Sequence, residues 1–131
     1  MKVLALDYGS ARTGVAVSDP SGLIARPLTV VEQVGTKKGS ERLLAVIAEE
    51  QPEQIVVGLP LTMRGEHGKQ ARETDLFVAR LRESVTVPVE LFDERLTTVL
   101  AARTLSDTPE DARAAAHLLE SFLEWSSNRE N

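Results

Sequence analysis

Three acidic positions in this chain each lie at the edge of a regular element. Asp7 follows an apolar run that begins at Lys2, the pair Asp93-Glu94 follows another, and Asp111 opens a helical pattern near the C-terminus. Clustered carboxylates repel one another and attract a counter-charge, and oxygen-only ligands of this kind select the hard cations Mg²⁺ or Mn²⁺. Two such ions can activate a water and stabilise the leaving oxygen of a phosphodiester. The three positions therefore predict metal-dependent phosphodiester hydrolysis, provided that the fold brings them together.

Two of these positions also have a structural interpretation. Asp7 could cap the turn that begins at Gly9, as Asp often does after a strand. Asp111 occupies the N3 place of a capping box, which would satisfy the start of the last helix. However, spacing places Asp111 on the core-facing stripe of that helix, which is formed by Asp111, Ala115, Leu118 and Phe122. Capping and metal binding do not exclude each other.

The adjacent pair Asp93-Glu94 poses a choice. Neighbouring side chains on a strand point to opposite faces, so only one of the two is expected on the side of Asp7. Alternation groups Asp93 with Val89, and a twist at the strand end would bring Glu94 to that side instead. The structural alternative is an ion pair with Arg95 or a charge near the next helix entry.

A basic loop suits a polyanionic substrate. Residues 59–70 follow a strand and carry Arg64, Gly65, Gly68 and Lys69 ahead of a helix N-terminus, where glycine allows close approach and the helix favours phosphate. The alternative is a solvated helix face with mixed charges. The expected nucleic-acid contacts are Arg12, Lys37, Lys38, Arg64, Lys69 and Arg95.

Composition restricts the other possibilities. The chain has 131 residues, which is the size of one domain, here residues 1–131, and its 42% hydrophobic and 27% charged residues are typical of a soluble globular protein. The net charge of −5 disfavours coating of nucleic acid by bulk attraction. With no cysteine, no secretion signal and no 18-residue apolar run, we expect a cytoplasmic protein without a membrane span. Of the two histidines, we expect His67 in a solvated loop and His117 on a helix surface.

The apolar rhythm predicts the elements that position these residues. It predicts strands over residues 2–7, 13–18, 24–31, 54–58 and 87–92, the third at an edge or bulge because of Pro27. It predicts helices from an N-cap at Ser40 to about Gln51, over residues 69–84, after a cap at Thr97 or Thr98, and from Pro109 to near Trp125. Three strands in quick succession favour an antiparallel meander, and strands separated by helices run parallel. We therefore expect an α/β fold with a five-stranded mixed sheet, three antiparallel strands then two parallel ones, and helices on both faces.

Four segments carry a family resemblance. LALDYGSARTGVAVSD, IVVGLPLTMRGEHGKQA, VELFDERLTT and DARAAAHLLESFL resemble, in order, the motifs of the YqgF/RuvX family of Holliday-junction-resolvase-like proteins. The resemblance covers nearly the whole chain. It implies a ribonuclease H-like fold, related to the RuvC resolvases. It also implies a metal-dependent nuclease that matures the precursor of small-subunit ribosomal RNA and, in some members, cuts branched DNA.

The same resemblance assigns residues. It makes Asp7 the first-strand acid, Asp93-Glu94 the second acidic site and Asp111 the last-helix acid, all as ligands of Mg²⁺ or Mn²⁺, and it makes the loop at residues 64–69 a contact to the substrate backbone. This chain departs from the family in two places: only residues 105–108 stand where a longer basic segment is usual, and the last motif, which carries Asp111, reads DARAAA where a more apolar version is usual. The short segment bears on substrate choice more than on chemistry, and the changed motif bears on the assignment of Asp111.

Two other functions remain open. A non-catalytic module that binds precursor RNA would fit the short basic segment and the acidic total. A nucleotide phosphotransferase would fit DYGSARTG, which resembles the phosphate loop of actin-like ATPases, but those enzymes use two such domains. The sequence allows a monomer or a homodimer, and symmetric cutting of two strands would require a two-fold dimer.

Overall fold

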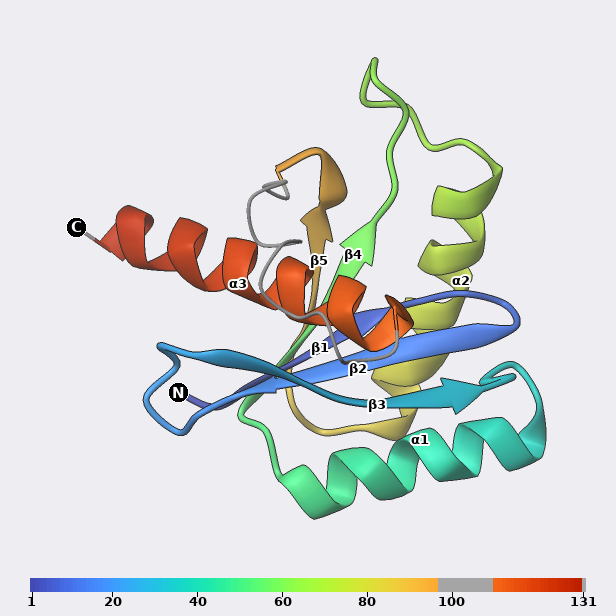
Figure 1. The fold of residues 1–131 in the computed structure, drawn as a ribbon. Helices are drawn as coiled ribbons and strands as arrows, with labels where there is room; N and C mark the ends of the chain where they lie inside the picture. The colour runs from blue at the N-terminus through green and yellow to red at the C-terminus, as the bar shows by residue number, and fades with distance from the viewer. Residues whose placement is uncertain (97–109, 131) are drawn as a thin grey trace.

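Five strands form one mixed sheet in the order β3-β2-β1-β4-β5 (Figure 1). The computed structural model describes residues 1–96 and 110–130. Strands β1 (Val3–Asp7), β2 (Arg12–Ser18) and β3 (Ala25–Glu32) are antiparallel neighbours. Strands β4 (Gln54–Leu59) and β5 (Val89–Asp93) continue the sheet in parallel with β1. The predicted α/β fold with three antiparallel and two parallel strands is confirmed.

Helices cover both faces of this sheet, as predicted (Figure 1). Helices α1 (Lys37–Glu50) and α2 (Lys69–Ser84) pack on one face, and α3 (Glu110–Glu130) packs on the other. A short 3₁₀ turn, η1 (Glu94–Leu96), follows β5 directly. No helix in residues 1–96 or 110–130 is both long and apolar enough to cross a bilayer.

Alternate side chains of β1 point to opposite faces of the sheet and so contribute to a hydrophobic core on each face. The core beneath α1 and α2 includes Leu4, Leu6, Leu43, Ile47, Val78 and Leu81. The core beneath α3 includes Val3, Ala5, Phe92, Leu119 and Phe122. Because β1 is buried on both faces, it is held in the middle of the sheet, and its last residue, Asp7, stands at the carboxyl edge.

The edge strand behaves as its proline predicts. β3 is at the edge of the sheet, and its pairing with β2 shifts register between Val15 and Ala16, where Ala16 faces Pro27. A proline cannot donate to the ladder, so it is tolerated at such an irregular edge position.

Two helix boundaries differ from the sequence prediction. Helix α1 begins at Lys37, and its N-cap is Thr36, whose hydroxyl accepts a hydrogen bond from the Gly39 backbone N–H at 3.1 Å. Ser40 therefore lies inside the helix. The early start is possible because Gly39 has no Cβ, which would otherwise overlap the Gln33 carbonyl oxygen at 1.8 Å. Helix α3 extends to Glu130, past the expected end, and the helix expected after Thr97 or Thr98, like the expected opening at Pro109, lies outside the described residues.

Candidate active site

Two of the predicted acids meet at the carboxyl edge of the sheet. Asp7 ends β1 and Glu94 follows β5, with β4 lying between these two strands. Glu94 crosses β4 over Gly58, where an added Cβ would lie only 2.5 Å from Glu94 Oε1. The missing side chain at Gly58 thus leaves room for Glu94 to reach Asp7.

The electrostatics of Glu94 reflect this closeness. Burial, then the negative charge of Asp7 and a hydrogen bond with its carboxylate, then the charge of Asp93, raise the pKa of Glu94 to about 7. Two carboxyl groups in one low-dielectric site favour retention of a proton between them. A divalent cation could take the place of that proton, so this pair fits Mg²⁺ or Mn²⁺ by charge and by ligand type.

Asp93 has a different environment. Its carboxylate accepts from Arg95 Nη2 at 2.6 Å, from Arg95 Nε at 3.0 Å and from the Arg95 backbone N–H at 2.9 Å. The Arg95 side chain, chiefly by hydrogen bonding, lowers the pKa of Asp93. Arg95 Nη1 also donates to the Met63 carbonyl at 3.4 Å, which connects the pair to the loop before α2. The ion-pair alternative therefore describes Asp93.

Strand alternation explains why Glu94 and not Asp93 approaches Asp7. Along β5, Val89 and Leu91 contact the core beneath α1 and α2, and Phe92 contacts the core beneath α3. Along β1, Val3 and Ala5 also contact the α3 side. The positions of Asp7 and Glu94 continue that side of their strands, so no twist is needed.

Helix α3 closes the site on that side. Ala114, His117 and Leu118 line a pocket together with Asp7 and Glu94. Asp111 lies in the first turn of α3, one turn before Ala114, and its side chain is outside the described residues. The His117 ring is half-buried, and its Nδ1 is buried with no hydrogen-bond partner within the described part of the chain. The expectation of a surface histidine was wrong, because residue 117 faces this pocket.

A second hollow opens from the acids toward α2. Its lining shares Asp7 and Glu94 with the pocket beneath α3 and adds Tyr8, Gly9, Ser10, Pro60, Gln70, Glu73 and Thr74. No Lys or Arg lines either hollow in the described part of the chain. Within residues 1–96 and 112–129, no three His, Asp or Glu side chains are grouped closely enough to hold a metal by themselves. Sequence reasoning missed Glu73, although its helical spacing from Phe77 and Arg80 marks a common face.

The predicted basic contacts are distributed around the same end of the molecule. Arg12 begins β2 close to the end of β1, and Lys37 and Lys38 form the first turn of α1. The loop between β4 and α2 extends beyond the sheet and carries Arg64, with Lys69 at the start of α2 (Figure 1). Arg95 is engaged by Asp93 as described.

Local hydrogen bonds shape the loop that carries Arg64. Gly65 adopts a positive φ of 81° and its N–H donates to the Thr62 carbonyl, a conformation that favours glycine. The Thr62 hydroxyl accepts from the Glu66 N–H at 3.0 Å. His67 is exposed, as expected, and its Nδ1 lies 2.8 Å from Asp75 Oδ2. The loop is therefore folded on itself.

The strand order, the helices on both faces and the acids at the ends of β1 and β5 define a ribonuclease H-like protein. Residues 1–125 match the family model described as "RuvX: Holliday junction resolvase", and the chain belongs to this family. It is 42% identical to a "Putative pre-16S rRNA nuclease" of Roseiflexus sp. (strain RS-1) over 94% of both chains. It is 37% identical to the protein of the same name from Thermoanaerobacter pseudethanolicus, over 98% of this chain and all of that one.

Solved structures support the same fold. Thermus thermophilus RuvC in complex with a Holliday junction substrate matches with a TM-score of 0.67 at 20% identity, covering 98% of this chain and 96% of that one. The Fowlpox virus resolvase in complex with substrate Holliday junction DNA matches with a TM-score of 0.52 at 9% identity, covering 99% and 98%. At these identities the likeness concerns the fold alone.

Proposed function

We propose that this protein is a metal-dependent nuclease that hydrolyses phosphodiester bonds in the precursor of 16S ribosomal RNA. The observation that carries the proposal is the approach of Glu94 to Asp7 across Gly58, which joins two carboxylates in one partly buried site. The names of the relatives supply the substrate. A ribosomal RNA precursor also implies that the protein works in the cytoplasm.

The residues of the site would divide the work as follows. Asp7 and Glu94 would hold Mg²⁺ or Mn²⁺, with Asp111 as the third acid because it lies one turn before a lining residue, Ala114. A cation held there would supply an activated water and neutralise charge on the leaving oxygen. Glu94 must give up its proton to become a ligand, so binding is coupled to pH. Asp93 would hold Arg95 and the neighbouring loop in place instead of contacting the cation.

Cleavage of an end-labelled precursor fragment in Mg²⁺ tests this proposal. We expect Asp7→Asn and Glu94→Gln each to slow cleavage by about 100-fold or more, since each removes charge at the reacting centre. Glu90→Gln is the matched control, because Glu90 lies near the start of β5, at the end opposite Glu94, and accepts a hydrogen bond from Gln54. Equal rates for the wild type and Asp7→Asn would contradict the mechanism.

The same assay separates the enzyme from a binding module. A non-catalytic module would retain the RNA in EDTA and show no turnover in Mg²⁺ even at high protein concentration. A four-way DNA junction included as a second substrate tests branched DNA. A monomer suffices for a single cut in RNA, whereas paired symmetric cuts in a junction would require a homodimer.

A further inference from the structure

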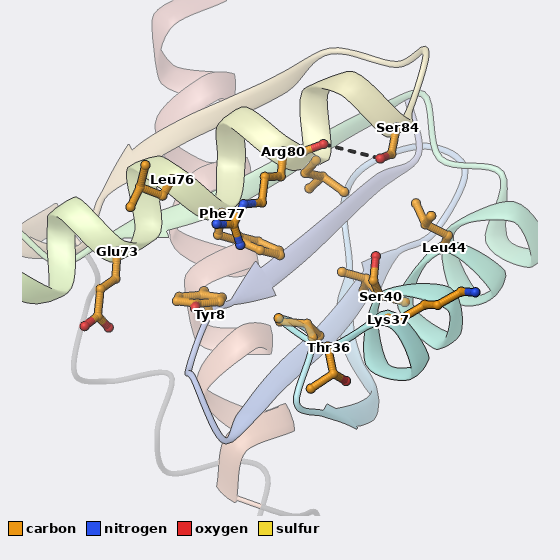
Figure 2. A pocket seen from close by; sticks show the side chains of 14 residues that line it. Tyr8, Thr36, Lys37, Ser40, Leu44, Glu73, Leu76, Phe77, Arg80 and Ser84 are labelled. Carbon is orange, nitrogen blue, oxygen red and sulfur yellow. Dashed lines mark hydrogen bonds between the residues drawn. The ribbon is translucent and has the colours of Figure 1, made fainter.

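A groove lies between α1 and α2, next to the acidic site. Figure 2 shows side chains from the two helices facing each other across it, with Tyr8 at one end. Its volume is about 370 Å³, within the range of pockets that hold small organic groups. Tyr8 and Glu73 of this groove also line the acidic hollow, and Lys37 is one of the predicted basic contacts.

Two aromatic rings form a wall of the groove. The rings of Tyr8 and Phe77 stack with a centroid distance of 4.5 Å and an interplanar angle of 20° (Figure 2). Both side chains are only partly buried, although they pack against the core. Leu76 beside them is 61% exposed. An apolar, aromatic wall that is open to solvent is the surface on which a nucleobase stacks.

The charges beside the rings favour an anionic ligand. Arg80 extends along α2 toward the Phe77 ring, whereas Lys37, at the start of α1, lines the groove with its nitrogen turned away from the rings (Figure 2). Neither side chain forms a hydrogen bond or an ion pair with the described residues. Glu73 is the single carboxylate among the lining residues, and it lies at the junction with the acidic hollow. Arg80 is therefore available to a phosphate beside the rings, and the Glu73 carboxylate can accept from a ribose hydroxyl or a base amine.

The groove is continuous with the proposed active site. Tyr8 and Glu73 line both hollows, and Tyr8 follows Asp7 in the chain. Because consecutive side chains on a strand point to opposite faces, Asp7 serves the α3 side and Tyr8 the α1 and α2 side of the same edge. A strand with a phosphate at Asp7 and Glu94 would place its neighbouring nucleotide over this edge, against Tyr8 and Phe77.

We propose that the groove binds an unpaired nucleotide of the RNA next to the cut bond, with its base against the Phe77 and Tyr8 rings and its phosphate near Arg80. This inference rests on the proposed nuclease function and adds that the substrate is single-stranded beside the cut. A base inside a duplex is already stacked and cannot enter such a groove, whereas an unpaired base can be splayed onto aromatic rings.

RNA binding in EDTA tests the groove independently of cleavage. The probe is a short single-stranded RNA with an end fluorophore, and the readout is anisotropy. We expect Phe77→Leu, which keeps an apolar side chain against the core, to weaken binding about tenfold, and Phe77→Tyr to retain it. Arg80→Ala should weaken binding several-fold, and Arg26→Ala, which removes the same charge near the opposite end of the sheet, should not.

The outcomes separate this inference from the proposed function. A blunt-ended RNA duplex should bind the wild type and Phe77→Leu equally, which supports an unpaired base in the groove. Equal affinity of the wild type and Phe77→Leu for single-stranded RNA, with matching melting temperatures, would overturn the inference and leave the groove to a partner of another class. That result would leave the proposed nuclease function intact, because the effect of Asp7→Asn on cleavage is measured separately, in Mg²⁺ with the precursor fragment.

Discussion

At the residue scale, the chemistry depends on which of two adjacent acids reaches Asp7. The sequence predicts that only one of Asp93 and Glu94 can do so, but it leaves the choice open. Two features settle the placement in the structure: Glu94 continues the α3 side of β5, and Gly58 leaves space for it to cross β4. The space at Gly58 depends on the pairing register of β4 with β5. The sequence pattern around residues 93–94 does not contain that information.

Gly58→Ala tests the crossing directly. The new methyl would overlap Glu94 Oε1, so Glu94 must leave Asp7. We expect cleavage to fall by about 10- to 100-fold, the cost of misplacing a ligand through its support, measured with the labelled precursor fragment.

A double-mutant cycle controls for wider damage at Gly58. If Gly58 acts only by leaving room for Glu94, adding Gly58→Ala to a Glu94→Ala protein changes the rate no further. A full additional loss in the double variant would mean that the methyl disturbs β4 itself.

The raised pKa of Glu94 predicts a pH-dependent stability of the metal-free protein. Between pH 4.5, the ordinary value for Glu, and about pH 7, the native state retains a proton that the unfolded state has released. The unfolding free energy contributed by Glu94 is therefore fully present below about pH 4.5 and falls as the pH rises to about 7. Glu94→Gln is uncharged throughout and lacks this decline.

Thermal unfolding in EDTA between pH 4.5 and 8 measures that difference. The melting temperature of the wild type relative to Glu94→Gln should decrease across this range, and Mg²⁺ should oppose the decrease because a cation favours the ionised carboxylate. Parallel curves for the two proteins in EDTA would contradict the proximity of Glu94 to Asp7.

At the element scale, the apolar periodicity predicted all five strands of the sheet and the presence of helices on both of its faces. It could do so because side-chain alternation along the strands builds one core on each face. It placed the N-cap of α1 at Ser40, four residues beyond the observed cap, Thr36. Ser and Thr are both good caps, and the choice of Thr36 depends on the close approach of Gly39 to the Gln33 carbonyl, a tertiary contact. His117 was misplaced for a similar reason, since the pocket beneath α3 exists only once α3 packs on the sheet.

Replacement of the two hydroxyl residues distinguishes the predicted cap from the observed one. Thr36→Ala removes the acceptor for the Gly39 N–H and should lower the unfolding free energy by about 1 kcal/mol. Ser40→Ala, inside the helix, should change it by less than about 0.5 kcal/mol. Urea unfolding monitored by circular dichroism measures both, and the reverse ranking would restore Ser40 as the cap.

At the scale of the whole molecule, an acidic protein must bind a polyanion through a local surface. The net charge is −5, yet the acidic hollow is flanked at the same end by basic residues on separate elements. These are Arg12, Lys37, Lys38, Arg64 and Lys69, and Arg80 lies farther along α2, beside the groove. Arg95 adds little because Asp93 already neutralises it. Affinity should therefore come from few phosphate contacts together with base stacking in the groove.

The salt dependence of RNA binding measures how many contacts there are. Each neutralised phosphate of a single strand contributes about −0.7 to the slope of log K against log salt, so six contacts at most give a slope no steeper than about −4. Arg80→Ala should make the slope shallower by about 0.7, and Arg26→Ala should leave it unchanged because Arg26 lies near the opposite end of the sheet. Phe77→Leu should weaken binding at every salt concentration without changing the slope, since stacking releases no counterions. A slope of about −7 or steeper would require a footprint larger than this end of the molecule offers, and would place much of the RNA elsewhere on the surface.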